Sequence, residues 1–281
     1  MDFCKIERKM SRPQKTPKEI ATAAEQNAHL YSTQIPPQLE PMIRLLRTSG
    51  IAPPDVEAHL HAILIEQRDK AWAIFPYGAI GSFSFLDMNP SLDDPLFQAV
   101  IKRLNTPGST ETFLDVGCGL GFVLRYLAAE GVSSERLYGT DLQERFLDLG
   151  YDLFHDRDRT KATYVSGDML GEEDSSFRKL RGQIDIIYAS AFFHLFEAKD
   201  QMKAAKRMVG FLKPDCENAL IFGQNGGPKI PSWEKYVLDK NAWSRMWDEV
   251  GKATGTSWRT ETNVESSKEW IRVRFAIYRV V

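Results

Sequence analysis

Apolar and polar residues follow two different patterns in the first part of this chain and in the rest of it. In its first part, apolar residues recur at three- and four-residue intervals from Val56 through Leu60 to Leu64, and Pro54 precedes them. This spacing predicts a helix that extends toward Trp72. Further along, short apolar runs bounded by turn residues alternate with helical patterns. The alternation predicts an α/β fold.

The apolar runs beyond residue 97 are rich in β-branched residues, as strands usually are. We expect strands over residues 113–115, 136–141, 162–169, 184–190 and 219–223, and a final pair near 258–264 and 270–278. We expect helices from about 121, over 144–154, over about 198–212, and after an N-cap at Asn241. The short connection between the last two strands favours antiparallel pairing. The sequence therefore predicts a mostly parallel seven-stranded sheet with an antiparallel C-terminal strand.

These patterns divide the chain into three parts. Residues 1–20 are polar and are expected to form a disordered tail, residues 21–96 a helical N-terminal portion, and residues 97–281 the sheet domain. An aromatic, glycine-containing stretch over residues 74–86 lies near the end of the N-terminal portion. It can form core beneath a loop or a lid over a ligand, and both interpretations stay open.

Composition narrows the range of partners. The chain of 281 residues is 43% hydrophobic and has a formal net charge of -2, so no basic surplus favours nucleic acid. No apolar run approaches the length of a membrane span. The cysteines, Cys4, Cys118 and Cys216, lack paired or metal-binding spacing, and we expect no metal site. The polar start over Met1–Thr16 has no secretory apolar segment, so we expect a cytoplasmic protein.

A glycine-rich loop follows the first strand of the sheet domain. It reads Asp115-Val-Gly117-Cys-Gly119-Leu-Gly121, with a glycine at every second position. Glycine permits positive φ angles and close approach of a ligand to the backbone. The spacing differs from the dinucleotide-binding pattern G-x-G-x-x-G. An acid two residues before the first glycine suits a cationic amino-acid ligand better than a pyrophosphate, although a turn without a ligand is an alternative.

Acidic residues also end the next two strands. Asp141 follows Gly121 by twenty residues, which matches the offset at which a carboxylate binds ribose hydroxyls. Asp168 ends the third strand, and the fourth strand is a nearly continuous apolar run that ends at Ala189 and Ser190. A continuous apolar strand is typical of a sheet covered on both faces. The strand ends therefore predict one ligand site along one edge of the sheet.

Together these strand ends resemble the motifs of class I S-adenosylmethionine (SAM) methyltransferases. The resemblance implies SAM as the cofactor and a Rossmann-like class I methyltransferase fold for residues 97–281. The methionine moiety would lie at the glycine loop, the ribose at Asp141 and the adenine at the end of the third strand. The residues that the resemblance assigns to the cofactor are Tyr77, Asp115, Gly117, Gly119, Asp141, Leu142, Asp168, Met169, Ala189 and Ser190. Tyr77 would close over the cofactor, and Ala189 and Ser190 would line the methyl-transfer side.

Other segments resemble a narrower group, the methyltransferases of fungal meroterpenoid and polyketide biosynthetic clusters. These segments are residues 83–87, 137–141, 149–158, 191–196 and 212–214, together with the glycine loop. Members of this group commonly methylate a carboxyl group of a polyketide–terpenoid acid. The resemblance therefore implies O-methylation of a small hydrophobic secondary metabolite to a methyl ester. The central Cys118 departs from the paired cysteines or other small residue frequent in this loop, and we expect it to pack rather than react.

The acceptor side of the site is less defined by the sequence. His194 follows the fourth strand and either orients or deprotonates the acceptor, or serves as a packing or capping residue. Phe193, Gln224 and Trp233 are candidate substrate-binding residues. A carboxylate acceptor needs no base, whereas a phenol would need one.

Other functions stay open beside methyl transfer. A SAM-binding protein of the same fold could steer cyclisation or rearrangement, or regulate a partner, without transferring a methyl group. The glycine spacing disfavours an NAD-dependent oxidoreductase. The neutral overall charge, and the absence of an Asn-Pro-Pro-Tyr-type tetrapeptide after the fourth strand, disfavour methylation of bases. A homodimer is a further hypothesis.

Overall fold

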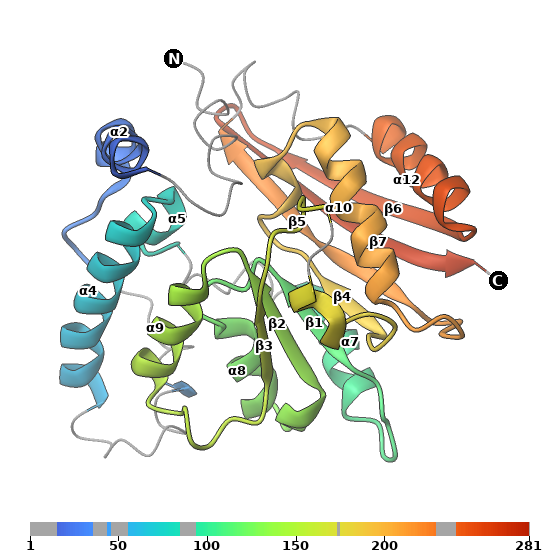
Figure 1. Ribbon diagram of the computed structural model, residues 1–281, viewed down its shortest axis with the longest axis horizontal. Coiled ribbons are helices and arrows are strands. Elements are labelled where there is room, and N and C mark those ends of the chain that lie inside the picture. The colour runs from blue at the N-terminus through green and yellow to red at the C-terminus, as the bar shows by residue number, and fades with distance from the viewer. Residues whose placement is uncertain are drawn as a thin grey trace.

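The computed structural model describes residues 16–35, 44–45, 56–84, 94–172, 175–228 and 240–280. These residues form a seven-stranded sheet with the strand order β3-β2-β1-β4-β5-β7-β6 (Figure 1). The strands are β1 (Phe113–Val116), β2 (Leu137–Asp141), β3 (Thr163–Ser166), β4 (Ile186–Tyr188), β5 (Leu220–Pro228), β6 (Ser257–Ser266) and β7 (Trp270–Val280). Strands β1 to β5 pair in parallel, and β7 pairs antiparallel with both β5 and β6. The predicted mostly parallel sheet with one antiparallel strand is confirmed.

The strand order reverses beside β1. From β1 the chain continues to β2 and β3 on one side, and it returns to place β4 and β5 on the other. At such a switch point the loops after neighbouring strands diverge and leave a crevice at their carboxyl ends. The loops after β1 and β4 therefore flank the place where a ligand is expected.

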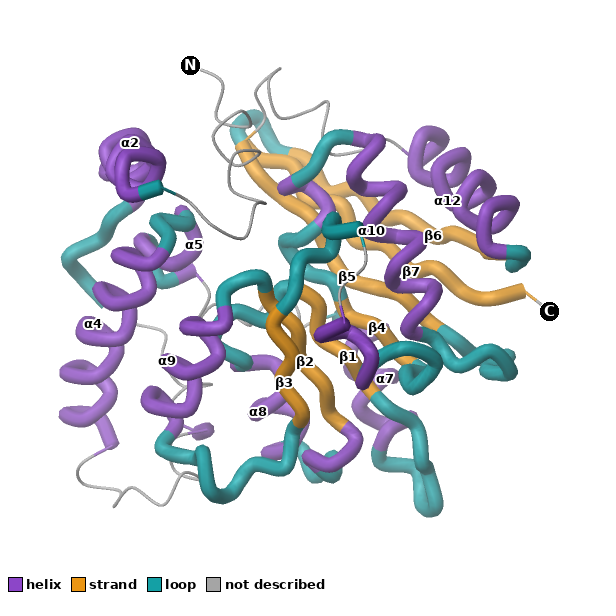
Figure 2. The backbone as a smooth tube through the Cα atoms, viewed as in Figure 1, coloured by secondary structure: helices purple, strands orange, loops and turns teal. Residues whose placement is uncertain are grey.

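Helices cover both faces of the sheet (Figures 1 and 2). One face packs against α7 (Pro95–Leu104), α8 (Phe122–Ala129) and α9 (Glu144–Phe154), and the other against α10 (Ala198–Phe211) and α12 (Lys240–Thr254). Short 3-10 helices are η4 (Ser134–Arg136), η5 (Ser175–Lys179) and η6 (Phe193–Leu195). Successive β1 residues Phe113 and Leu114 belong to the cores on opposite faces. This double burial explains why the central strands are apolar throughout.

The observed helices follow the predicted ones with two differences of detail. Helix α9 has the predicted bounds, and the Trp243 and Trp247 pair of α12 is buried as core. Helix α12 begins at Lys240, so Asn241 lies inside its first turn and is not the N-cap. Strand β5 continues to Pro228, well beyond the predicted end at residue 223, because β7 pairs with it along its whole length.

In the N-terminal portion, the described elements include α2 (Pro17–Asn27), η1 (Ala28–Leu30), α4 (Val56–Ile74) and α5 (Gly78–Gly81). Helix α4 packs against α9 and so joins this portion to the sheet domain (Figure 1). Buried Arg68 holds the portion together, since it donates to the carbonyl oxygens of Ser32 at 2.6 Å and Gly81 at 3.2 Å. Within the described ranges, the structure has no helix of the length and apolarity that crossing a membrane requires.

Two helices cross the boundaries expected between the three parts of the chain. Helix α2 begins at Pro17, inside the segment expected to be a disordered tail, because Thr16 and Glu19 form a capping box and Pro17 occupies the first turn. Helix α7 spans the expected domain boundary at residue 97 and packs on the sheet. The expected boundary at residue 97 therefore falls inside α7, and the division into domains stays a prediction.

Candidate active site

The glycine loop between β1 and α8 runs through three left-handed glycines. Gly117, Gly119 and Gly121 have φ angles of 76°, 54° and 70°. Residues with a side chain rarely adopt these φ angles, which explains why glycine occupies every second position of the loop. The amides of Gly117 and Cys118 donate to the Thr140 carbonyl oxygen at 2.8 Å and 3.0 Å and anchor the loop to β2. A Cβ atom on Gly119 would meet no atom of the described residues within 4 Å, so these residues leave space open beside this part of the backbone.

Cys118, between Gly117 and Gly119, packs against β2. Its side chain is 8% exposed, and its Sγ atom lies 3.0 Å from a Cβ built on Gly139. Burial raises the pKa of the Cys118 thiol well above its ordinary value, and the nearby Asp115 adds to the rise. A protonated, buried thiol is a poor nucleophile. The expected packing role of Cys118 agrees with this environment.

Asp141 at the end of β2 binds the glycine loop directly. Its carboxylate accepts from the amide of Gly119 at 2.9 Å and from the amide of Gln143 at 2.9 Å. Burial raises the pKa of Asp141, while these amides act in the opposite direction. The structure thus brings Asp141 against the backbone of Gly119, as one shared ligand site requires.

Asp115 lies at the end of β1 with 4% of its surface exposed. Burial, and then repulsion from Asp141, raises the pKa of Asp115 to about 8. Asp115 is buried and Asp141 is half-buried, and two neighbouring carboxyl groups that repel one another favour a cation beside them. SAM carries an ammonium and a sulfonium group, so this acid pair fits the cofactor that the sequence implies.

The ends of β2 and β3 are joined along the same edge of the sheet. The amide of Gly167 donates to the carbonyl oxygen of Asp141 at 3.0 Å. The Asp168 carboxylate accepts from the amide of Leu170 at 2.8 Å and closes the following turn. Met169 is 6% exposed, and Leu142 is half-buried. Leu142, Asp168 and Met169 therefore lie next to Asp141, where the adenine is expected.

The ends of β4 and β5 approach one another closely on the other side of β1. A Cβ on Gly223 would lie 2.5 Å from the carbonyl oxygen of Ala189, so glycine is required there. The amide of Ala191, with a left-handed φ of 52°, donates to the Gln224 carbonyl oxygen at 2.7 Å. Ser190 and Gln224 are half-buried beside this junction. The buried Oε1 atom of Gln224 has no hydrogen-bond partner among the described residues.

Phe193 and His194 lie in η6, after β4. Phe193 is fully buried, with its ring centre 5.1 Å from that of Trp243 and 5.7 Å from that of Phe275. It is therefore part of the core beneath α12 and does not face an open site. His194 is 7% exposed; burial lowers its pKa to about 4, against a side-chain hydrogen bond with Asn225. At neutral pH His194 is uncharged.

Tyr77 connects the N-terminal portion to the cofactor edge. Its ring centre lies 4.5 Å from that of Phe75 and 6.0 Å from that of Phe146 in α9. Helix α9 directly follows the turn after Asp141. Tyr77 thus lies on the side of the molecule where a lid over the cofactor is expected. Trp233 lies outside the described residues.

The sequence analysis missed Arg125 and Asp156, which form a buried ion pair beside the glycine loop. A charged residue in the otherwise apolar run of α8 was a signal for such a pair. Asp156 lies in the segment 149–158, singled out above for its resemblance alone. Asn225, the buried neighbour of His194, was also missed, since local sequence does not place β5 beside η6.

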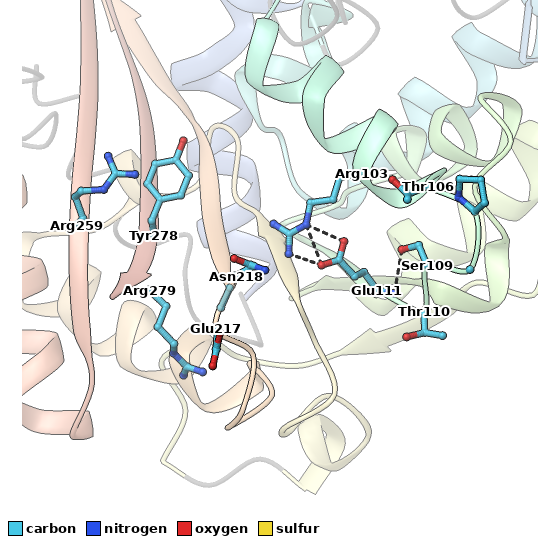
Figure 3. A pocket seen from close by; sticks show the side chains of 13 residues that line it. Arg103, Thr106, Ser109, Thr110, Glu111, Glu217, Asn218, Arg259, Tyr278 and Arg279 are labelled. Atoms are coloured by element: carbon cyan, nitrogen blue, oxygen red, sulfur yellow. Dashed lines mark hydrogen bonds and ion pairs between the residues drawn. The ribbon is translucent and has the colours of Figure 1, made fainter. Parts of the chain in front are cut away.

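A groove at the opposite edge of the sheet is unrelated to this site (Figure 3). It has a volume of about 880 Å³ and lies beside the residues that precede β1 and β5, Glu111 and Ala219. Arg103 from α7 and Glu111 form an ion pair on its wall (Figure 3). Because α/β proteins bind ligands at the carboxyl ends of parallel strands, we place the active site at the other edge.

The strand order, the glycine loop and the acids that end β1, β2 and β3 define a class I SAM-dependent methyltransferase. A family model described as "Methyltransferase domain" matches residues 113–215, and one described as "Meroterpenoid methyltransferase N-terminal domain" matches residues 20–86.

Two similar proteins show to which family this chain belongs. "O-methyltransferase phiE" of Fungal sp. (strain ATCC 74256) is 34% identical over 262 residues, which cover 90% of this chain and 85% of the relative. "Asnovolin E/Chermesin D methyltransferase nvfJ" of Aspergillus novofumigatus (strain IBT 16806) is 34% identical over 202 residues, covering 69% and 71%. The chain belongs to the fungal biosynthetic-cluster O-methyltransferases, which use SAM.

A solved structure shows the same fold. The selenomethionine-substituted CurJ carbon methyltransferase is 14% identical, with a TM-score of 0.50, and the match covers 94% of this chain and 79% of that one. The similarity extends over most of the chain. At this level of identity it shows the fold alone.

Proposed function

We propose that this enzyme transfers the methyl group of SAM to the carboxyl group of a small hydrophobic polyketide–terpenoid acid and so forms a methyl ester. The observation that carries the proposal is the burial of His194, whose pKa lies at about 4. A carboxyl group with an ordinary pKa of about 4 is already ionised at neutral pH. It needs no general base, whereas a phenol with a pKa of about 10 does.

Two comparisons support the substrate class. The N-terminal portion matches the family model described for meroterpenoid methyltransferases. The relative from Aspergillus novofumigatus is named as an asnovolin E/chermesin D methyltransferase. We extend the class of compound, and not the individual compounds, to this chain.

In the proposed arrangement, SAM supplies a methyl group already activated by the positive charge on its sulfur. Asp115 binds the ammonium group, and the cation in turn favours the carboxylate form of Asp115. The backbone of Gly117 and Gly119 holds the methionine moiety. Asp141 accepts hydrogen bonds from the ribose hydroxyls while it still binds the Gly119 amide. The loop and the ribose are then aligned by one carboxylate.

The adenine and the lid complete the proposed cofactor site. Leu142 and Met169 pack against the adenine ring, and the Asp168 carboxylate accepts from the adenine amino group. Tyr77 closes over the cofactor from the N-terminal portion. This role is supported by its ring contact with Phe146.

On the acceptor side, Ala189 and Ser190 line the path of methyl transfer. Gln224 stays a candidate substrate contact beside them, and its Oε1 atom has no hydrogen-bond partner among the described residues. Trp233 stays a candidate substrate contact from the sequence, whereas the burial of Phe193 leaves it out of the proposal. The protein then contributes mainly desolvation and alignment, which can supply roughly 7–11 kcal/mol at best.

A mass-spectrometric assay with methyl-deuterated SAM tests the proposal. The acceptors are aromatic and terpenoid carboxylic acids, each beside an analogue in which only a phenol remains. We expect a gain of one labelled methyl group on the acids, removed by mild alkali, and none on the phenol analogues. An alkali-resistant label, or labelling of the phenols alone, would replace the ester proposal with another acceptor group.

A cytoplasmic location and a homodimer stay predictions that rest on the sequence. Sedimentation velocity of the purified protein tests the dimer. Fluorescence of a tagged chain in a fungal host tests the location.

A further inference from the structure

Helix α8 carries a buried positive charge beside the cofactor loop. Arg125 is 8% exposed and lies in an otherwise apolar helix. A buried charge is costly unless it is paired and hydrogen-bonded. A specific arrangement must therefore compensate for Arg125 at this position.

The compensation comes from Asp156, just beyond α9. The Arg125 Nε and Nη2 atoms donate to the two carboxylate oxygens of Asp156 at 2.7 Å and 2.9 Å. His155 ends α9 with a left-handed φ of 47°, and this turn brings Asp156 to the guanidinium. The guanidinium carbon also lies 4.4 Å from the ring centre of Phe154. Such a two-pronged pair fixes the guanidinium plane in one orientation.

The remaining nitrogen of Arg125 holds the glycine loop. Its Nη1 atom donates to the carbonyl oxygen of Leu120 at 2.8 Å and to that of Gly121 at 3.1 Å. A Cβ atom on Gly150 of α9 would collide with the same Leu120 carbonyl oxygen, so the backbone of α9 lies directly against it. The end of the loop is therefore held from the α9 side, while the space beside Gly119 stays open.

We propose that Asp156, acting through Arg125, is a positioning residue that sets the affinity for SAM without touching it. The ion pair keeps the Leu120 and Gly121 carbonyl groups, and hence the loop through Gly119, in the conformation that binds the cofactor. The segment 149–158 thereby gains a role at the cofactor site: Gly150 allows the close packing and Asp156 supplies the charge. The inference rests on the proposed placement of SAM on this loop.

The size of the effect follows from population arithmetic. The apparent dissociation constant equals the intrinsic one divided by the fraction of molecules with a binding-competent loop. Asp156→Asn leaves the Arg125 charge without its carboxylate and frees the guanidinium to turn. If the competent fraction falls to about a tenth, the Kd for SAM rises about tenfold.

The experiment measures the Kd for SAM by calorimetry and the Tm without ligand, for the full chain and three variants. Glu111→Gln is the matched control, because it breaks the comparable Arg103–Glu111 pair (Nε to Oε2, 2.7 Å) at the far edge of the sheet. We expect Asp156→Asn to raise the Kd about tenfold and KM for SAM with it, with a much smaller change in kcat at saturating SAM. Glu111→Gln should lower the Tm less, because its pair with Arg103 is more exposed, and should keep the Kd within about twofold of the wild type.

Asp141→Asn separates this inference from the placement of SAM. If Asp141→Asn weakens SAM binding and Asp156→Asn does not, the positioning role is refuted while the placement stands. If neither variant changes the Kd, the placement itself is refuted.

A second variant and a measurement on the unchanged protein cover the case that Asp156→Asn does not fold. Arg125→Lys keeps the charge but loses the planar fork, and a Kd equal to that of the wild type would refute the inference. In the wild type, SAM should slow amide hydrogen exchange at residues 155–157 as well as in the glycine loop. Unchanged exchange at residues 155–157 would also refute it.

Discussion

At the scale of single residues, the carboxylate form of Asp115 lowers the stability of the folded chain but favours the binding of a cationic ligand. Burial and repulsion from Asp141 raise its pKa to about 8 in the folded chain, from an ordinary value of 3.8. Between these two pH values the folded state binds more protons than the unfolded state, so the free energy of unfolding falls as pH rises. A cation beside Asp115 offsets this cost by favouring the carboxylate.

We predict that Asp115→Asn stabilises the ligand-free protein at pH 8 and weakens SAM binding. Asparagine does not ionise, so the loss of stability from this group between about pH 4 and pH 8 disappears. A gain of about 1 kcal/mol would raise the Tm by roughly 2–4 °C. The ammonium group of SAM loses a charged partner, and we expect the Kd to rise about tenfold. Calorimetric unfolding across pH and SAM titration at pH 8 measure both effects; a lower Tm at pH 8 would contradict the first.

His194→Asn tests whether the buried histidine acts as a base. A general base contributes about 10²–10⁴ to the rate, so a rate within tenfold of the wild type argues against that role. We expect the variant to stay within that tenfold range. We also expect the wild type and the variant to have the same kcat/KM profile between pH 5 and pH 8, because the pKa of His194 lies at about 4. Initial rates with a carboxylic acid acceptor over this pH range provide the measurement. A 100-fold loss in a variant with unchanged Tm would restore the catalytic role.

The sequence predicted the positions of Asp115 and Asp141, but it did not predict the burial of Phe193, and the difference has a physical reason. Asp115 and Asp141 end short strands, and a strand end in a parallel sheet has a position that the local pattern already defines. Phe193 follows the fourth strand in the same way, yet α12 and β7 cover it from distant parts of the chain. Burial of that kind depends on tertiary packing, which local sequence does not show.

At the scale of elements, the packing of α9 on the glycine loop reverses the usual effect of replacing glycine by alanine inside a helix. Alanine normally stabilises a helix interior over glycine by about 1 kcal/mol. At Gly150 in α9 the added Cβ would collide with the backbone carbonyl of Leu120, which cannot move without disturbing the loop. Gly210 in α10 has nothing within 4 Å of such a Cβ and is exposed.

We predict opposite signs for the two substitutions. Gly210→Ala should raise the free energy of unfolding by about 0.5–1 kcal/mol. Gly150→Ala should lower it by about 1–3 kcal/mol, as overpacking does, and should also weaken SAM binding. Urea unfolding of both variants beside the wild type measures the difference. A stabilising Gly150→Ala would mean that α9 does not press on Leu120.

The bounds of the helices and strands also show where the apolar pattern fails to predict the structure. Helix α9 was predicted to the residue because its apolar stripe is strongly periodic. The second half of β5, Gln224 to Pro228, is polar and rich in glycine, and it extends because β7 pairs with it. Similarly, α2 begins early through a local capping box that the polar composition of the tail obscured. Long-range pairing and local capping both act independently of the apolar pattern.

At the scale of the whole molecule, the N-terminal portion meets the sheet domain on the cofactor side. Helix α4 packs on α9, and Tyr77 contacts Phe146. Helix α9 in turn lies against the glycine loop through Gly150. A continuous set of contacts therefore joins the N-terminal portion to the loop that holds the proposed cofactor. In the aromatic stretch that the sequence left as either core or lid, Phe75 is core, while Tyr77 is half-buried and its lid role stays a proposal.

We predict that Tyr77→Ala raises KM for SAM several-fold, because it removes the ring that joins the N-terminal portion to α9. A tilted or edge-on aromatic pair contributes about 0.5–1.5 kcal/mol, and 1.4 kcal/mol corresponds to tenfold in an equilibrium constant. Tyr77→Phe keeps the ring and should stay within about twofold of the wild type. Tyr31→Ala is the control, because Tyr31 packs on Trp72 at 5.2 Å within the N-terminal portion. Steady-state kinetics with saturating acceptor measure KM; if Tyr31→Ala and Tyr77→Ala raise it equally, loss of packing within the N-terminal portion explains the effect and the lid does not.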